Sequence, residues 1–451
     1  MVAPRRDLVA LLSAVLALAV VTPAGADVHT GHVDDPVFQQ GLQWGLDRIH
    51  APQAWAASTG KGVTIAIVDS GADLHHEDLA GKVVGQVSCI GADGDPSRCT
   101  GSAQDDNGHG THVAGIAAAS TDNGRGVAGV APDAKLLIVR VLANTCTTST
   151  DCNATGSATD VAAGIRWAAQ HGADVINLSL GGSSLGSALG CAFCDAVEDA
   201  WKAGAIPVIA AGNDSVLPPS FADEPAVIVT ATTREDTLAS YSNSTGGITG
   251  DARWPVAAPG GEGETNPADC ATGGHPKGIL STYWISGRTN QYACLAGTSM
   301  AAPHVSGALA LLLATGLTPN QAIQRLLSTA TDLGPKGRDD SFGYGRIDLQ
   351  AALDPSSPPS TVPVAPGPPT TAPSGSTTTR PSTTTAPSSS TTTTAPPASV
   401  PAPVAAAPFS PASAPSDGHD DVPPWLTGLA IVLVAGVAVA LGANARRLLR
   451  T

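Results

Sequence analysis

The sequence predicts an α/β protein with an open, doubly wound and mostly parallel sheet flanked by helices. A disordered Pro/Ser/Thr-rich linker and one C-terminal transmembrane helix are expected to follow it. Three observations carry this prediction. Apolar runs of strand length alternate with amphipathic stretches of helix length up to about residue 353. The composition then changes abruptly to Pro, Ser, Thr and Ala. Residues 425–443 carry no charge and match the thickness of a bilayer.

Composition and charge narrow the functional classes. The chain has 451 residues with 42% hydrophobic content, which leaves room for one core domain of roughly 300 residues. A formal net charge of -15 argues against nucleic-acid binding. The eight cysteines, an even number behind an apparent export signal, favour a disulfide framework in an oxidising compartment.

The first 26 residues have the pattern of a signal peptide. Arg5 and Arg6 precede the apolar run 8–21, and Ala24 and Ala26 occupy the positions that a signal peptidase reads. We therefore expect cleavage after Ala26. A twin-arginine signal is the alternative, but the residues around the arginine pair match it poorly, so we favour the general export route.

Residues 27–35 form a short extension, and residues 36–354 form the predicted α/β domain. Strands are predicted at 63–68, 136–142, 174–180, 206–211 and 226–232. Helices are predicted at 109–119, 158–171, 188–203, 299–314 and 319–330, the last with Thr318 as N-cap. In such a layout, ligands bind at the carboxyl ends of the strands.

Three polar residues stand at strand ends or helix starts. Asp69 ends the first predicted strand, although an Asp there is more often only a turn former. His109 opens a helix between two glycines, although a lone His is more often structural. Ser299 opens another helix, where free N–H groups favour a developing oxyanion, although Ser is also an ordinary N-cap. An acid, a base and a nucleophile in this order indicate a catalytic triad.

The motifs around these residues resemble those of the subtilisin-like serine proteases, peptidase family S8. The family's Asp-Ser-Gly, His-Gly-Thr-His and Gly-Thr-Ser-Met-Ala-x-Pro motifs match residues 69–71, 109–112 and 297–303. The resemblance covers about residues 35–353 and implies an endopeptidase that acts on polypeptides through an acyl-enzyme. It implies Ser299 as nucleophile, His109 as general base and acid, and Asp69 as the residue that fixes the imidazole tautomer.

The same resemblance extends to the residues that would hold the substrate. Asn213, in Ala-Ala-Gly-Asn, matches the residue that supplies the oxyanion hole beside the backbone N–H of Ser299. Residues 179–181 resemble the strand that pairs with an extended peptide, so Ser179, Leu180, Gly181 and Gly212 form the expected substrate-binding set. No cofactor is expected for catalysis.

A structural calcium site is an open possibility. The family often binds calcium with an Asp nine residues after the triad Asp, which is the position of Asp78. The loop 120–124 offers further oxygen ligands but departs from the family's usual sequence, so the sequence does not decide between a calcium-bound and a calcium-free domain. The histidines outside the triad are expected to be structural, with His112 and His304 in helices and His75 and His76 in a loop.

The cysteines suggest four local disulfides: Cys89–Cys99, Cys146–Cys152, Cys191–Cys194 and Cys270–Cys294. Each bridge would pin a surface insertion rather than the core. Cys191-Ala-Phe-Cys194 is also compatible with a redox or zinc motif, but no second pair and no neighbouring His supports zinc.

The C-terminal part reads as a tether. Residues 355–424 cannot bury a core, and as a polyproline-like chain they would span roughly 220 Å. Residues 425–443 are the predicted transmembrane helix, the alternative being a buried helix of a soluble domain. Arg446, Arg447 and Arg450 in the tail 444–451 place the C-terminus in the cytoplasm.

Taken in order, these segments predict a single-pass cell-membrane serine endopeptidase whose catalytic domain is extracytoplasmic. The order also resembles the mycosins, membrane-anchored proteases of bacterial secretion systems, although the segments around Asp69 and His109 look more like thermitase-type enzymes. A surface binding or stalk protein with an inactive protease domain is the alternative from another class, and the complete triad with Asn213 argues against it. Because residues 27–35 are too few for a folding-assisting pro-domain, we expect the domain to fold without one.

Overall fold

The computed structural model describes residues 33–146, 152–180, 193–214, 224–246, 251–262 and 276–358. The chain divides into two units, residues 1–376 and 377–451, and all described residues belong to the first. The predicted signal peptide, Gly181, most of the linker, the transmembrane helix and the basic tail lie outside the described residues. Among the helices within them, none combines the length and apolar character that crossing a membrane requires.

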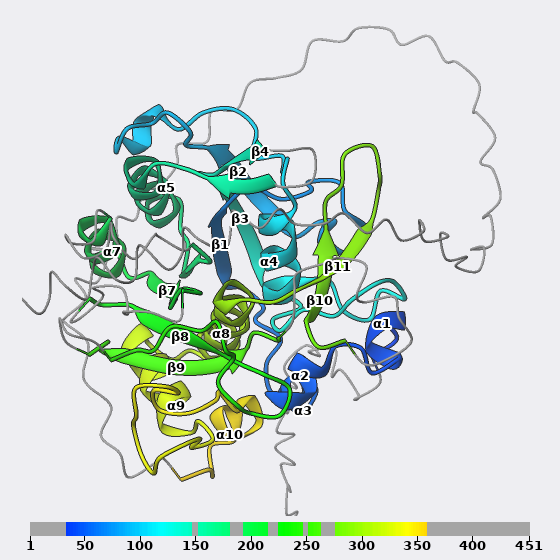
Figure 1. The fold of residues 1–451 in the computed structure, drawn as a ribbon, viewed down its shortest axis with the longest axis vertical. Coiled ribbons are helices and arrows are strands. Elements are labelled where there is room, and N and C mark those ends of the chain that lie inside the picture. The colour runs from blue at the N-terminus through cyan, green and yellow to red at the C-terminus, as the bar shows by residue number, and fades with distance from the viewer. Residues whose placement is uncertain are drawn as a thin grey trace, which may run out of the picture. The chain divides into compact units, whose positions relative to one another are not determined.

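A parallel sheet forms the centre of the domain (Figure 1). Its seven strands, in spatial order, are β2 (Val83–Ser88), β3 (Lys135–Arg140), β1 (Thr64–Asp69), β6 (Val175–Leu178), β7 (Ile206–Ala210), β8 (Val227–Thr232) and β9 (Trp254–Pro259). All neighbouring pairs are parallel. From β1 the chain runs to the edge strand β2, returns to β3 beside β1, and then crosses to β6, from which it winds outward to β9; the direction thus reverses at β1. This confirms the predicted doubly wound sheet and places its switch point between β1 and β6.

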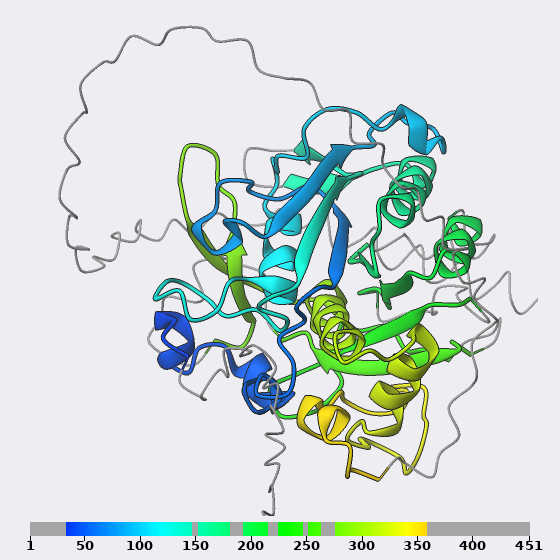
Figure 2. The same ribbon diagram turned by 180° about the vertical axis from the view of Figure 1, so that it is seen from behind.

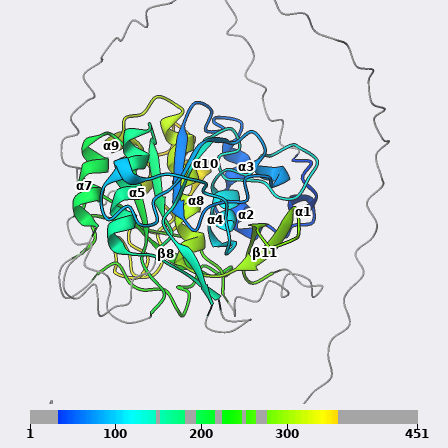
Figure 3. The same cartoon turned by 90° about the horizontal axis from the view of Figure 1, so that it is seen from above.

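Helices cover both faces of the sheet (Figures 1 and 3). On one face lie α4 (His109–Ala118), α8 (Thr298–Leu313) and α9 (Pro319–Ser328), and on the other α5 (Ala158–Gln170) and α7 (Cys194–Lys202). Strand β1 serves both layers, because Ile65 and Ile67 pack into the core of α4 and α8, whereas Ala66 and Val68 pack against α5 and α7. Burial on both faces explains the nearly continuous apolar run in this strand.

Smaller elements complete the domain and are seen from both sides in Figures 1 and 2. They are α1 (Pro36–Gln39), α2 (Trp44–Arg48), α3 (Ala51–Ala54), α10 (Leu349–Leu353), the 3₁₀ turns Glu77–Leu79 and Pro96–Arg98, and the hairpins β4 (Ala143–Cys146) with β5 (Cys152–Thr155) and β10 (Ile279–Tyr283) with β11 (Gln291–Leu295).

The predicted strands and helices agree with the structure to within a few residues, and Thr318 caps α9 in a full capping box. The predicted helix 188–203 is seen from Cys194 onward, and residues 188–192 lie outside the described part. Within the main sheet the prediction missed β9 and β2, and outside it the two hairpins β4–β5 and β10–β11. Strand β9 contains Pro255 and Pro259, which argue against a central strand but are tolerated at a sheet edge. Strand β2 is the other edge and is only partly buried.

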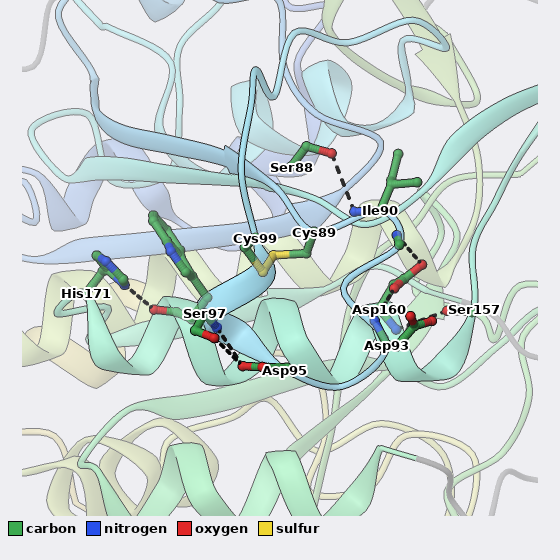
Figure 4. The surroundings of a disulfide bond; sticks show 12 residues. Ser88, Cys89, Ile90, Asp93, Asp95, Ser97, Cys99, Ser157, Asp160 and His171 are labelled. Atoms are coloured by element: carbon green, nitrogen blue, oxygen red, sulfur yellow. Dashed lines mark hydrogen bonds between the residues drawn. A yellow bond between two sulfur atoms is a disulfide. The ribbon is translucent and has the colours of Figure 1, made fainter.

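One predicted disulfide is present in full, between Cys89 and Cys99 (Figure 4). The loop that it closes is held onto the start of α5, because the Asp160 carboxylate accepts hydrogen bonds from the backbone N–H groups of Gly91 and Asp93, each at 3.0 Å. This bridge pins a surface loop, as predicted.

The other three disulfides are tested only in part. Cys194 and Cys294 are disulfide-bonded, and their predicted partners, Cys191 and Cys270, lie outside the described residues. A bonded Cys194 does not bind zinc, so the zinc alternative loses its support. The β4–β5 register pairs Cys146 with Cys152, and a bridge between them stays a prediction.

Candidate active site

The predicted site residues gather at one edge of the sheet. Strand β1 ends at Asp69, β6 is followed by Ser179, and β7 by Gly212 and Asn213. These three strands are neighbours and parallel, so their carboxyl ends meet at the same edge. Helices α4 and α8 pack on this part of the sheet, and they begin with His109 and Thr298.

Asp69 and His109 are in direct contact. Asp69 is fully buried, and its Oδ1 lies 2.8 Å from His109 Nδ1. Ser70 N–H donates to the same oxygen at 2.7 Å. The His109 side chain remains 24% exposed, so the ring still reaches solvent. With Nδ1 directed at the carboxylate, Nε2 is left as the atom that can exchange a proton with a substrate or nucleophile.

The charges around His109 set its basicity. Burial acts to lower the pKa of His109, but the negative charge of Asp69, its hydrogen bond and the charge of Asp105 outweigh burial, and the pKa is raised above its ordinary value. A base with a raised pKa takes a proton more readily, and the imidazolium that results is stabilised by the buried carboxylate.

Asp105, which the sequence analysis did not single out, joins the two segments that carry Asp69 and His109. Its Oδ1 accepts from Ser70 Oγ at 2.9 Å and from Asn107 N and Gly108 N at 3.0 Å. Its Oδ2 accepts from Thr111 N at 3.0 Å and Thr111 Oγ1 at 2.5 Å. Five donors on one buried carboxylate fix the end of β1 against the start of α4.

Close backbone packing explains the glycines of the His-Gly-Thr-His segment. A Cβ at Gly110 would lie 2.1 Å from the Gly71 carbonyl oxygen, so a larger residue would push α4 away from Asp69. Gly108, with φ of 103°, lies against Tyr283, where a Cβ would come within 2.6 Å of the ring.

His112 and His304 are structural, as expected. His112 is buried, and its Nε2 lies 3.0 Å from the carbonyl oxygens of Ile279 and Ala293, which connects α4 to the β10–β11 hairpin. Burial lowers the pKa of His112 to about 3 and that of His304 to about 4, so both are neutral near pH 7. His76 lies in a loop, as expected, where it is fully buried and caps the 3₁₀ turn at Glu77–Leu79.

Ser299 is the second residue of α8. A proline in this helix allows Ser299 to bond to Ser179, which follows β6. Pro303 has no N–H, so the Ser299 carbonyl oxygen lacks the helical donor four residues on. Ser179 Oγ donates to that oxygen at 2.7 Å instead, and Ser299 Oγ donates to the Ser179 carbonyl oxygen at 3.3 Å. These reciprocal bonds fix the start of α8 against the end of β6.

Asn213 is oriented by the first residue of α8. Its Oδ1 accepts from Thr298 N and from Thr298 Oγ1, both at 2.9 Å, which leaves the side-chain N–H₂ as the available group. A Cβ added at Gly297 would lie 3.4 Å from Asn213 Nδ2 and 3.6 Å from Ser299 N. Two N–H donors therefore border the same small space beside Ser299, which is the arrangement that stabilises an oxyanion.

The rest of the substrate-binding prediction is partly covered. Gly212 forms the turn that presents Asn213, with φ of 100° and no room for a side chain beside Asn243. Leu180 packs against the α5–α7 layer of the core. Gly181 lies outside the described residues.

The predicted calcium ligand Asp78 is held by protein donors and lies outside the group of acidic residues Asp34, Asp35 and Asp122. It is fully buried, and its carboxylate accepts hydrogen bonds from Asn123 Nδ2 at 2.9 Å, Val127 N at 2.9 Å and Tyr292 OH at 3.0 Å. Oxygens of Asp34, Asp35 and Asp122 lie within 4.8 Å of one another in the same region. The predicted loop 120–124 thus meets the N-terminal segment, which the sequence analysis did not consider.

Asp35 has the least compensated carboxylate of this group. It is fully buried, and Oδ1 has no hydrogen-bond partner among the described residues, while Oδ2 accepts from Asp122 N at 2.9 Å. The pKa of Asp35 is raised to about 6, chiefly by burial. The charges of Asp34 and Asp78 also raise this pKa, whereas hydrogen bonds from the backbone N–H groups of Asp122 and Asn123 lower it. Several carboxylate oxygens in a partly buried site suit calcium.

Comparison with known proteins identifies the family of the chain. The model of the Subtilase family, Peptidase_S8, matches residues 60–345. The chain is 39% identical over 322 residues to thermitase from Thermoactinomyces vulgaris, which covers 71% of this chain and 98% of thermitase. It is 37% identical over 327 residues to subtilisin DY from Bacillus licheniformis, and the match covers 69% of this chain and 99% of subtilisin DY. Among solved structures, a protease from Pseudoalteromonas arctica PAMC 21717 matches with a TM-score of 0.57 and 31% identity, over 71% of this chain and 98% of that one.

Proposed function

Because the chain belongs to the subtilase family and is a serine protease, we propose that Asp69, His109 and Ser299 form its catalytic triad. The observation that carries the proposal is the 2.8 Å contact of Asp69 with His109, at the sheet edge where α8 presents Ser299. The substrates are polypeptides, and the proposed reaction is cleavage of internal peptide bonds.

In the proposed mechanism, His109 Nε2 removes the proton from Ser299 Oγ while the oxygen attacks the carbonyl carbon of the scissile bond. The imidazolium then gives this proton to the leaving amine, and an ester of Ser299 with the acyl part of the substrate remains. Water, deprotonated by His109, attacks the ester carbonyl; the bond to Ser299 Oγ then breaks, the imidazolium returns the proton to Ser299 Oγ, and the acyl part leaves as a carboxylic acid. Asp69 fixes the imidazole tautomer and stabilises the imidazolium in both steps.

The oxyanion of each tetrahedral intermediate is assigned to the space beside Gly297. Asn213 Nδ2 and Ser299 N–H border it and would donate to the negative oxygen. Thr298 supports this role, because its two hydrogen bonds hold Asn213 Oδ1 away from the oxyanion. The backbone of residues 179–181 is assigned to main-chain pairing with an extended substrate.

We also propose a structural calcium ion at the N-terminal segment. Asp35, with Asp34 and Asp122 beside it and Asp78 nearby, would hold the ion. The bound ion would neutralise the buried Asp35 and connect the N-terminus of the domain to the loop that follows α4. It would stabilise the fold and take no part in bond cleavage.

The sequence supports a cellular setting for this enzyme. We propose that residues 1–26 direct export, that residues 355–424 act as a spacer, and that residues 425–443 anchor the protein in the cell membrane with the catalytic domain outside the cytoplasm. The Cys89–Cys99 disulfide suits an oxidising compartment. The same order of segments leaves a mycosin-like role in a secretion system as a narrower proposal.

Replacement of the nucleophile tests the proposed activity. Ser299→Ala should reduce turnover of a denatured protein substrate by about 10⁶-fold, a magnitude measured on subtilisin, a member of the same family. Ser97→Ala, at an exposed serine, is the matched control and should keep the wild-type rate. A Ser299→Ala protein that retains more than a trace of activity, after identical purification, would refute the assignment.

A further inference from the structure

A cavity of about 280 Å³ lies where three distant parts of the chain meet. We call it the arginine pocket; it is lined by Trp44, Asp47, Arg48, His50, Arg234 and Arg346. The first four residues come from α2 and the start of α3, Arg234 from the turn after β8, and Arg346 from the segment before α10. None of them belongs to the proposed triad, oxyanion hole or calcium site.

The wall of the arginine pocket is basic in an otherwise acidic protein. Three arginines and one histidine line it beside a single carboxylate, Asp47, although the whole chain carries a formal net charge of -15. Like charges repel when they are brought together, so such a cluster is stable only where carboxylates or a bound anion offset the repulsion.

Two acidic residues outside the lining hold the basic side chains in place. Asp236 Oδ2 binds Arg48 Nη1 at 3.4 Å and also pairs with Arg346 Nη1. Asp348 Oδ2 lies 3.0 Å from His50 Nδ1. Arg48 Nη2 donates in addition to the Arg234 carbonyl oxygen. Asp236, which does not itself line the cavity, thus orients both Arg48 and Arg346.

The internal contacts leave hydrogen-bonding capacity unused. Arg346 is 5% exposed, and its buried Nε has no hydrogen-bond partner among the described residues. Its Nη2 has a long contact of 3.4 Å with Thr331 Oγ1. A guanidinium group presents its donors in a planar fork that matches oxyanions, so arginines held in fixed positions around a cavity form a recognition site for them.

We propose that the arginine pocket binds a small oxyanion of the phosphate or sulfate class. The ion would lie against Arg48, Arg234 and Arg346 and accept hydrogen bonds from their guanidinium groups. Because the pocket joins α2 and α3 to the turn after β8 and to the segment before α10, an occupied pocket would also stabilise these contacts. Arg234 is the most informative residue to change, because it is partly exposed on a turn.

The test is calorimetric titration of inorganic phosphate into the full-length protein carrying Ser299→Ala, which prevents self-digestion. We expect saturable binding with a dissociation constant near or below about 1 mM. Arg234→Gln should weaken it at least about tenfold, since one of three guanidinium groups is lost. The matched control is Arg166→Gln, which removes a partly buried arginine paired with Asp199 on α7 and should leave the affinity within about twofold.

Three results would overturn the proposal: no saturable heat up to about 20 mM phosphate, equal weakening by Arg166→Gln, or unchanged affinity in Arg234→Gln. Arg48→Gln serves as a second variant if Arg234→Gln does not fold, and unchanged affinity there is equally contrary. A titration with glycerol 3-phosphate separates two sources of the ligand. Affinity equal to that of inorganic phosphate indicates a phosphate carried on a larger molecule, and affinity at least about tenfold lower indicates the free ion.

Discussion

Replacing Asp105 by Asn tests whether the segment carrying Asp69 and the helix carrying His109 are aligned by one buried carboxylate. An Asn side chain can keep one oxygen, so it can serve either the three donors at Oδ1 or the two at Oδ2. With the oxygen toward Ser70, the amide N–H₂ would face Thr111 N–H, and two hydrogen bonds would be lost. At about 1.5–3 kcal/mol for a bond to a charged group, partly offset by rotation of the Thr111 hydroxyl, we expect about 2–4 kcal/mol of lost stability.

The same substitution should change catalysis in a way that lost stability alone does not. The base must be neutral, so kcat/KM falls tenfold per pH unit below the pKa of His109, which lies above its ordinary value of about 6.5. The charge of Asp105 contributes to raising that pKa, and Asp105→Asn should therefore move the acidic limb to lower pH. Misalignment of β1 and α4 should also lower kcat by about 10- to 100-fold.

The assay is the pH dependence of kcat/KM with a peptide substrate, together with thermal unfolding in the Ser299→Ala background. Asp95→Asn is the matched control, since Asp95 also accepts hydrogen bonds from a following backbone N–H and a serine hydroxyl but is exposed and remote from His109. If Asp105→Asn unfolds at a lower temperature but keeps the wild-type kcat and acidic limb, Asp105 is structural only and the positioning argument is wrong.

Three further predictions follow from the site and the chain's ends. Asn213→Ala should lower kcat by about 10²–10³-fold with little change in KM, a magnitude known from subtilisin. Steady-state kinetics that show an unchanged kcat and only a raised KM would contradict the oxyanion role. Calcium at millimolar concentration should raise the melting temperature of metal-stripped protein, and Asp35→Asn should abolish that rise; identical wild-type curves in EDTA and calcium would exclude the site. A chain ending at Asp354 should be released from the membrane fraction and keep wild-type kcat/KM, whereas the full-length protein should sediment with membranes; equal partitioning of the two chains would refute the anchor.

The sequence was sufficient for the parts of the site that rest on local patterns. Asp69, His109 and Ser299 each stand beside a strand end or helix start, and parallel strand pairing brings such ends together without further information. Asp105 could not be found in this way, because an Asp shortly before Asn-Gly reads as an ordinary turn residue. Its role depends on Ser70, 35 residues away in sequence.

Other features depend on contacts that no local pattern records. Pro303 lies in the predicted helix 299–314, but the carbonyl oxygen that it leaves free is informative only once Ser179 is seen to donate to it. Asp35 and Asp78 lie in separate segments that meet only in the fold. The arginine pocket likewise combines Arg48 with Arg346, almost 300 residues apart in the chain.

Labelling of the wild-type protein with a fluorophosphonate, followed by mass spectrometry of its peptides, tests the central claim most directly. Such reagents phosphonylate a serine only when a neighbouring base and oxyanion donors activate it. We predict a single adduct on Ser299. The rate of labelling should fall as the pH drops below the pKa of His109, and His109→Ala should abolish labelling. An unlabelled Ser299 in folded wild-type protein, or an adduct on another serine that persists in Ser299→Ala, would contradict the proposed triad.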